Sequence, residues 1–226
     1  MISNLKSEDL QKAASDFHYL LNHEYPRKTI LTLVGNRYGL TFDQRHLLHR
    51  GIFSEAAAKK RKRKKISLQR LRNEKLAIDG YNVLITVEAA LSGRSLILSN
   101  DGFIRDISGL SGNFKKTDET DEAIRLILNL LKRAKPHHTL FLFDAPISRS
   151  GLLANEVREK LKNEHLSGNA MAVKVPEKVL IGFPGIVATS DTAIIDQSQE
   201  VFDLAGYIIK NRIRPGSLLT LKVTPI

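Results

Sequence analysis

The sequence predicts an α/β protein in which a small all-α domain precedes a parallel β-sheet covered by helices on both faces. Two observations lead to this fold class. From about residue 75 onward, near-continuous apolar runs alternate with helical patterns, as the strands and crossover helices of a parallel sheet do. The first 57 residues instead carry helical patterns alone. With 226 residues, 42% of them hydrophobic, the chain is long enough for one medium domain and a smaller one.

The N-terminal domain, residues 1–57, is predicted to contain about three helices. An amphipathic pattern covers residues 8–22. A second helix starts near Pro26 and ends at Gly39, which suits a C-terminal cap. A third starts with Thr41 and Gln44 in capping-box spacing. The last two have helix-turn-helix proportions, which are compatible with plain packing or with reading nucleic acid.

A basic linker, residues 58–73, is expected to follow. The first 70 residues hold 15 basic and 6 acidic side chains, a net charge of +9, whereas the remaining chain holds 20 and 18, a net charge of +2. A localised basic field favours a polyanion, with nucleic acid first and an anionic membrane second. The segment is interpreted as a nucleic-acid clamp, against the alternatives of a solvated linker or a nuclear-localisation signal. Its seven consecutive basic residues are Lys59, Lys60, Arg61, Lys62, Arg63, Lys64 and Lys65.

The α/β domain is predicted to span residues 74–226. The helical patterns cover 119–135, 150–166 and, at least in part, 192–212. Between helices, residues 91–119 form a long insertion in which Asp101–Gly102 signals a β-hairpin over 95–107. The C-terminal residues 216–226 are expected to add an edge strand. The predicted strands lie in 75–79, 138–144, 170–179 and 185–191.

Three aspartates end predicted strands: Asp79, Asp144 and Asp191. Because parallel strands open their carboxyl ends on one edge, these carboxylates are expected to converge there. Carboxylates that converge repel one another unless a cation lies between them, and oxygen ligands without Cys or His suit Mg²⁺ or Mn²⁺. The alternative is structural: Asp79 precedes Gly80 as in a turn, and Asp191 suits a helix N-cap.

The stretches "IDGYNVLI", "LFLFDAP" and "ATSDTAIID" resemble the PIN-like superfamily of metal-dependent nucleases, closest to its NYN branch. The resemblance covers residues 74–205. The whole chain also looks like an uncharacterised, largely prokaryotic family in which a short helical domain precedes a PIN-like domain. The resemblance implies a Rossmann-like sheet, an acidic Mg²⁺ or Mn²⁺ centre, RNA as the usual substrate and endoribonuclease activity. PIN-like proteins often form homodimers, although no dimer face is evident in this sequence.

The resemblance implies a role for each matching residue. Asp79, Asp144 and Asp191 match the metal-binding carboxylates, Thr189 accompanies Asp191, and Asp196 is a further catalytic acid. Asn82 would orient a phosphate or a water, or else cap a helix. Ser148 and Arg149 would hold a phosphate, or else Ser148 or Ser150 would cap the helix that follows. Asp106 and Glu122 are candidate outer carboxylates.

Several classes of function are disfavoured. Without cysteine there is no disulfide, thiolate zinc site or cysteine nucleophile, and no nucleotide-binding loop of the Walker or dinucleotide type is present. The sequence contains no apolar run of membrane-spanning length and no signal-peptide pattern, so a cytoplasmic, non-membrane protein is expected. The alternatives to a nuclease are a non-catalytic RNA- or ribosome-binding PIN-like module and a phosphatase for small phosphoesters.

Overall fold

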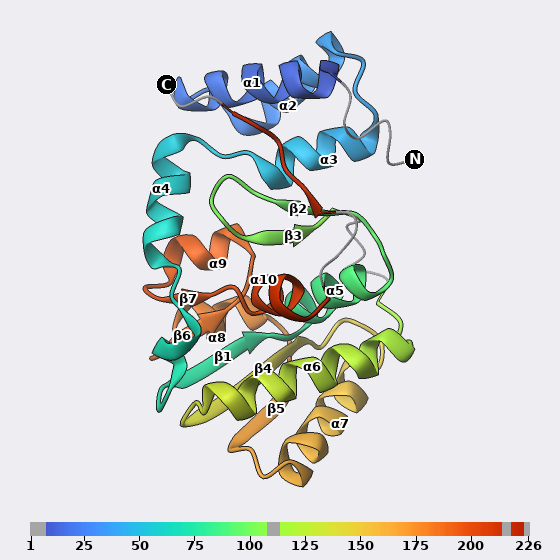
Figure 1. The fold of residues 1–226 in the computed structure, drawn as a ribbon, viewed down its shortest axis with the longest axis vertical. Coiled ribbons are helices and arrows are strands. Elements are labelled where there is room, and N and C mark those ends of the chain that lie inside the picture. The colour runs from blue at the N-terminus through green and yellow to red at the C-terminus, as the bar shows by residue number, and fades with distance from the viewer. Residues whose placement is uncertain (1–7, 108–113, 214–217, 224–226) are drawn as a thin grey trace. The chain divides into compact units, whose positions relative to one another are not determined.

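The computed structural model describes residues 8–107, 114–213 and 218–223 (Figure 1). The chain divides into two compact units. The helical unit comprises Met1–Arg63, Arg94–Ser108 and Gly216–Ile226, and the sheet unit comprises Lys64–Gly93 and Gly109–Pro215. This division differs from the expected boundaries at 57/58 and 73/74. The reason is that part of the insertion and the C-terminal strand pack with the N-terminal helices.

Four helices start the chain: α1 (Glu8–Asn22), α2 (Arg27–Arg37), α3 (Phe42–Gly51) and α4 (Glu55–Lys64). The predicted capping box opens α3, with Thr41 accepting from the Gln44 backbone and Gln44 accepting from the Thr41 backbone. Phe17 and the other apolar residues of α1 to α3 form the core of the helical unit. The prediction of a basic linker is corrected, because most of the basic segment is part of helix α4.

The predicted hairpin is present as β2 (Leu96–Leu98) and β3 (Ile104–Asp106), which pair antiparallel. Gly102 occupies the turn at a φ of 87°, a backbone conformation that favours glycine. The C-terminal strand β8 (Leu218–Leu219) pairs parallel with β2. The expected edge strand therefore exists, but it extends the small sheet of the helical unit rather than the large sheet. Burial explains this placement, since Ile97 and Leu219 both enter the core of the helical unit.

The sheet unit is built on a five-stranded sheet in the order β5-β4-β1-β6-β7, with every neighbouring pair parallel. The chain moves from β1 outward through β4 and β5, then returns to the other side of β1. The strand order therefore reverses between β1 and β6, which is the switch point where doubly wound folds bind ligands. The predicted Rossmann-like parallel sheet is confirmed. Its strands are β1 (Lys75–Asp79), β4 (His138–Asp144), β5 (Gly168–Val173), β6 (Ile186–Ala188) and β7 (Val201–Phe202).

Helices cover the sheet. The helices that begin at Gly80, Asp118 and Leu204 contact one another, while those that begin at Pro176 and Thr192 pack over an apolar cluster that includes Ala77 and Val187. One prediction is corrected here: residues 176–181 are helical rather than part of a strand, because Pro176 starts a helix. The 192–212 stretch is helical in part, as expected, and contains the short strand β7. The helical elements are η2 (Leu68–Leu71), α5 (Gly80–Leu91), α6 (Asp118–Ala134), α7 (Ser150–Asn163), α8 (Pro176–Ile181), α9 (Thr192–Gln197), α10 (Leu204–Ile208) and the π-helical turn η4 (Ile209–Ile213).

Within the described ranges, no helix combines the length and apolar character needed to cross a membrane.

Candidate active site at the carboxyl edge of the sheet

Asp79 is the last residue of the central strand β1, and α5 begins immediately after it at Gly80. The direct strand-to-helix junction brings the chain close to β4. A Cβ atom at Gly80 would lie 2.8 Å from the carbonyl oxygen of Leu142 and 2.4 Å from a ring carbon of Phe143. Glycine is therefore required at this position by packing. The Asp79 side chain forms no capping hydrogen bond to α5, so its carboxylate remains directed to other partners.

Thr189, which follows β6, holds the Asp79 carboxylate. Its hydroxyl donates to Oδ2 of Asp79 over 2.7 Å and accepts from the backbone N–H of Asp191 over 3.0 Å. Because β6 pairs directly with β1, Thr189 at the end of β6 lies beside Asp79 at the end of β1 and fixes its carboxylate. This network spans the switch point of the sheet.

Asn82, in the first turn of α5, links the helix to the same loop. Its side-chain oxygen accepts from the backbone N–H of Ser190 over 2.9 Å and from the Ser190 hydroxyl over 3.0 Å. The alternative role of Asn82 as a helix cap is therefore replaced by a tie between α5 and the β6–α9 loop.

The charge environment of Asp79 is unfavourable to a bare carboxylate. The residue is 8% exposed. Burial, with smaller contributions from the charges of Asp191, Asp144 and Glu177, raises the pKa of Asp79 to about 7, against the lowering effect of the Thr189 hydrogen bond. At neutral pH the site therefore favours a proton or a cation beside Asp79.

Asp144 ends β4, the neighbour of β1 on the other side. Burial and the charge of Glu177 raise the pKa of the Asp144 carboxyl. Burial and the charge of Asp144 raise the pKa of Tyr81 to about 12. Asp144 therefore acts electrostatically on both Asp79 and Tyr81.

Asp191 does cap a helix, as the structural alternative proposed. Its Oδ1 accepts from the backbone N–H groups of Ala193 and Ile194 at the start of α9. The side chain is exposed, and its charge still acts on Asp79. Asp196 lies near the other end of α9, where its backbone carbonyl accepts a hydrogen bond from Lys64.

The described part of the chain contains no group of three or more His, Asp or Glu side chains placed so that it could hold a metal ion. The charges of Asp144 and Asp191 thus act on Asp79, but the three carboxylates do not form a set of three metal ligands. Mg²⁺ commonly needs fewer protein ligands, because one or two carboxylates suffice when waters and a substrate phosphate complete the shell.

Ser148 and Arg149 occupy the loop between β4 and α7, and both are exposed. No side-chain hydrogen bond caps α7, so capping by Ser148 or Ser150 is not observed. The Ser150 hydroxyl instead donates to the carbonyl of Ala145. Ser148 and Arg149 face a hollow described below.

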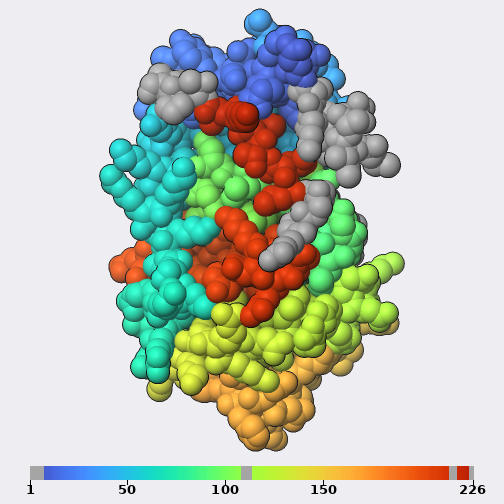
Figure 2. Space-filling view, in the orientation of Figure 1, coloured from blue at the N-terminus to red at the C-terminus, as the bar shows by residue number. Residues whose placement is uncertain are grey.

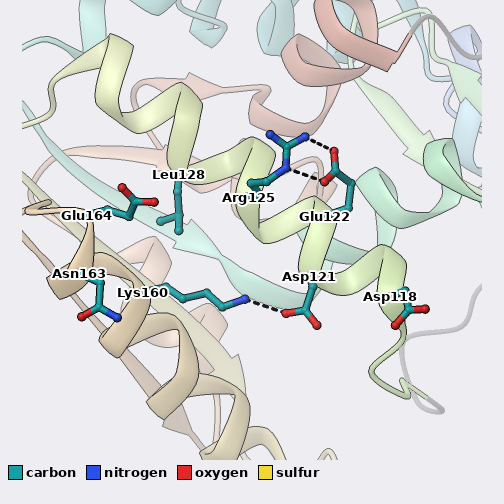
Figure 3. Close-up of a pocket in the computed structure, with 8 residues that line it drawn as sticks. All are labelled: Asp118, Asp121, Glu122, Arg125, Leu128, Lys160, Asn163 and Glu164. Atoms are coloured by element: carbon teal, nitrogen blue, oxygen red, sulfur yellow. Dashed lines mark hydrogen bonds and ion pairs between the residues drawn. The ribbon is translucent and has the colours of Figure 1, made fainter.

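The two candidate outer carboxylates lie on elements other than β1 and the loop after β6. Asp106 lies on β3, in the helical unit, and is buried. Glu122 lies on α6 and accepts two hydrogen bonds from Arg125, in a groove between α6 and α7 (Figure 3). This ion pair lowers the pKa of Glu122.

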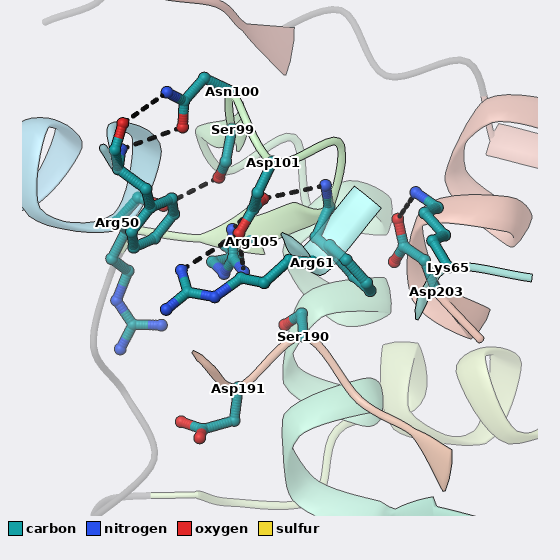
Figure 4. Close-up of polar contacts among 12 residues, drawn as sticks. Arg50, Arg61, Lys65, Ser99, Asn100, Asp101, Arg105, Ser190, Asp191 and Asp203 are labelled. Carbon is teal, nitrogen blue, oxygen red and sulfur yellow. Dashed lines mark hydrogen bonds and ion pairs between the residues drawn. The ribbon is translucent and has the colours of Figure 1, made fainter. Parts of the chain in front are cut away.

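The seven basic residues of the segment fall into two groups, those that bind other residues of the protein and those that are exposed. In the helical unit, Arg61 is 6% exposed and pairs with buried Asp101. In the sheet unit, Lys64 donates to two carbonyls at the end of α9, and Lys65 pairs over 2.7 Å with the buried Asp203 (Figure 4). The expected seven-residue clamp is thus corrected to four exposed cations. These are Lys59, Lys60, Lys62 and Arg63. Figure 2 shows atoms of α4 at the surface, in cyan at the left margin.

Sequence reasoning missed three residues of the site: Glu177, Ser190 and Tyr81. Glu177 follows β5 in the first turn of α8, so the rule that located the three aspartates also applies to it. Its signal was hidden because the strand pattern was extended through Pro176. Ser190 and Tyr81 carried no distinct signal, because serine and tyrosine are common near helix starts.

Two family models match the chain. Residues 68–207 match the model described as "Domain of unknown function (DUF5616)", and residues 9–64 match "Protein of unknown function (DUF434)". The chain belongs to the DUF5616 family. The DUF5616 match contains β1 through β7 and hence all four carboxylates of the site.

A relative of this DUF5616 protein is the "Uncharacterized protein MJ0935" of Methanocaldococcus jannaschii. The two are 36% identical over 203 residues, which cover 89% of this chain and 97% of the relative. The helical and sheet units therefore occur together in the relative. No solved structure matches the chain.

Proposed function

We propose that this DUF5616 protein is a metal-dependent endoribonuclease that hydrolyses RNA phosphodiesters at the carboxyl edge of its sheet. The observation that carries the proposal is the buried Asp79 at the switch point, whose charge is disfavoured by Asp144, Asp191 and Glu177. A site of this kind favours the binding of positive charge where doubly wound folds bind their ligands. The resemblance of the three aspartate motifs to PIN-like nucleases supports the same activity.

The donors fit Mg²⁺ or Mn²⁺ by their chemistry, since the site offers carboxylate, amide and hydroxyl oxygens without sulfur or imidazole. Asp79, with Asp144 or Asp191, would hold the ion, while waters and the substrate phosphate complete its shell. A bound ion would supply polarisation of the phosphoryl oxygen and a water of lowered pKa.

The chain's own residues position these groups. Thr189 holds Oδ2 of Asp79, which fixes the carboxylate relative to β6. Asn82 fixes Ser190 and thereby the loop that carries Asp191. A rigid arrangement of this type is what catalysis by positioning requires, because reorganisation during the reaction is avoided.

The exposed cations of α4 support nucleic acid as the partner. Lys59, Lys60, Lys62 and Arg63 carry four positive charges within five residues of one helix. Such a row contacts phosphates and releases counterions on binding. The family resemblance further supports a homodimer, which sedimentation velocity would measure. A cytoplasmic location is proposed from the sequence, which contains no signal-peptide pattern.

The test is a cleavage assay. Purified protein is incubated with labelled single-stranded RNA, structured RNA and single-stranded DNA, each with Mg²⁺, Mn²⁺ or EDTA. Asp79→Asn and Asp191→Asn are compared with Asp43→Asn, which makes the same chemical change at an exposed position of α3. We expect metal-dependent RNA cleavage that both site variants lose and the control retains.

Two outcomes would contradict the proposal. Cleavage that persists in Asp79→Asn would place the activity elsewhere. RNA binding without cleavage under every metal condition would favour the non-catalytic RNA-binding module.

A further inference from the structure

A hollow of about 650 Å³ lies in the sheet unit beside the candidate active site. Its wall comes from three segments: the start of α5, the residues before α6, and the loop from β4 into the first turns of α7. Tyr81 stands two residues after Asp79, and Ile147 to Arg149 follow Asp144 closely. The hollow therefore borders the carboxylates without including them.

The rim of the hollow has an excess of positive charge. Lys115 and Arg149 are exposed, and the described residues give neither one an ion-pair partner. Lys116 also lines the hollow but pairs with Glu156 over 2.7 Å, so these two charges cancel. Two uncompensated cations remain, one a guanidinium suited to two-point contact with phosphate.

Apart from Ser148, the remaining wall is formed by apolar and aromatic side chains, one of which carries a buried polar atom. The Tyr81 ring lies 4.9 Å from the ring of Phe114, and Leu152 is 67% exposed at the rim. Tyr81 itself is 3% exposed, and its buried hydroxyl has no hydrogen-bond partner among the residues that the structure describes. An unpaired buried hydroxyl is unfavourable, and a polar ligand atom that reached it would relieve that cost.

Apolar and aromatic walls with a few converging polar groups are typical of small-ligand sites. An aromatic and aliphatic surface next to two cations fits a nucleotide, whose base stacks and whose phosphate is anionic. A plain phosphate would leave the apolar wall without a role. An apolar ligand would leave both cations without one.

We propose that this hollow binds one phosphorylated nucleotide of the RNA strand, with its phosphate on Lys115 and Arg149 and its base against Phe114 and Leu152. The inference rests on the proposed function, in which RNA is the substrate. It assigns the hollow the task of holding the strand next to the carboxylates. The phosphate belongs either to the interior of the strand or to a 5′ end, and the experiment separates these sources.

The test measures binding without cleavage. Asp79→Asn protein in EDTA is titrated against fluorescent single-stranded RNA that carries either a 5′-phosphate or a 5′-hydroxyl. The double variant Lys115→Gln/Arg149→Gln is compared with Lys162→Gln/Arg133→Gln, which removes the same charges from exposed positions at the ends of α7 and α6.

We expect the pocket variant to weaken binding at least tenfold more than the control variant does. The protein with an intact pocket is also tested with both RNAs. If it binds the 5′-hydroxyl RNA more weakly than the 5′-phosphate RNA, by the same factor as the pocket variant loses, the hollow holds a terminal phosphate. Equal affinity for the 5′-phosphate RNA and the 5′-hydroxyl RNA indicates that the hollow holds a phosphate from the interior of the strand. A pocket variant that binds RNA as tightly as the control variant overturns the inference.

Tyr81→Phe provides a second measurement. Because the variant removes a buried hydroxyl that the described residues leave without a hydrogen bond, the free protein should keep or raise its melting temperature, while RNA binding weakens about threefold. A lowered melting temperature with unchanged binding would instead indicate a structural hydroxyl and count against the inference.

The two proposals can fail separately. RNA binding that depends on Lys115 and Arg149, with no cleavage in any metal, would retain the nucleotide site and refute the nuclease. Metal-dependent cleavage, with RNA affinity and KM unchanged in the pocket variant, would retain the nuclease and refute the nucleotide site.

Discussion

The hydroxyl of Thr189 donates a 2.7 Å hydrogen bond to the carboxylate of Asp79, although the two residues are 110 positions apart in the chain. The bond joins the ends of two adjacent parallel strands, β1 and β6. This hydrogen bond stabilises the charged form of the Asp79 carboxylate, whereas burial and three neighbouring acids destabilise that form. The stability of the site therefore depends on the balance between this bond and the charges around it.

Asp79→Asn should make the protein more stable at pH 8. The folded pKa of Asp79, about 7, lies above its ordinary value of 3.8, so folding favours the protonated acid. The stability that this group contributes is therefore present below about pH 4 and is lost as the pH rises to about 7. The loss amounts to roughly 4 kcal/mol at about 1.4 kcal/mol per pKa unit. Urea denaturation at pH 5 and pH 8 measures the part of this loss that falls between those two pH values, roughly 3 kcal/mol.

The asparagine of this variant would still accept the Thr189 hydrogen bond but could not ionise. We therefore expect the variant to lose this part of the pH dependence, while Asp43→Asn retains it. A variant that is clearly less stable than the wild type at pH 8 would assign Asp79 a purely structural role.

Thr189→Val should destabilise the protein at pH 8 by about 1–3 kcal/mol, because it leaves the buried carboxylate without its donor. Thr189→Ser keeps the hydroxyl and serves as the matched control. Thermal denaturation of both variants gives the comparison. If the Val and Ser variants melt at the same temperature, the hydroxyl that only the Ser variant retains does not determine the stability.

Asp101→Asn should destabilise the helical unit by about 3–5 kcal/mol, because it removes a buried carboxylate charge that pairs with buried arginines. Arg105 binds both Asp101 oxygens over 2.8 Å, and Arg61 contacts one over 3.5 Å (Figure 4). Both guanidinium groups, with that of Arg27, lie within 5.0 Å of the Phe53 ring centre. Burial and nearby positive charge lower the pKa of Arg27 to about 10.

The control for this variant is Glu8→Gln, which breaks an exposed pair with Lys12 and should leave the melting temperature unchanged. Similar melting temperatures for both variants would show that Asp101 does not neutralise the arginine cluster.

Replacing Lys59, Lys60, Lys62 and Arg63 by Gln should weaken RNA binding and flatten its salt dependence. Each lost phosphate contact lowers the slope of log K against log salt by about 0.7 for a single strand. Binding titrations at several salt concentrations measure this slope. An unchanged slope would contradict the role of α4.

The other three basic residues of the segment supply a contrast. Lys65→Gln removes the partner of buried Asp203 and should lower stability with little change in the salt slope. A salt slope that falls equally in Lys65→Gln would mean that this ion pair opens when RNA binds.

The sequence alone predicted much of the architecture. Local signals sufficed for α1, for the capping box of α3 and for the hairpin at Gly102, because each depends on residues close together in the chain. The alternation of apolar strands with helices predicted the parallel sheet, since only a strand buried on both faces is apolar throughout. The same topology placed Asp79, Asp144 and Asp191 on one edge.

The tertiary structure decided what local patterns do not encode. Seven adjacent basic residues look equivalent in the sequence, yet Arg61, Lys64 and Lys65 are paired with partners that the fold brings from 40 to 138 positions away. The strand β8 joins the sheet of the helical unit because its apolar side chains complete that core. The partnership of Asp79 with Thr189, and the influence of Glu177, likewise arise from strand order. The sequence thus determined which chemical groups stand at the strand ends, while long-range packing determined which of them meet, because pairing and burial depend on contacts between distant segments.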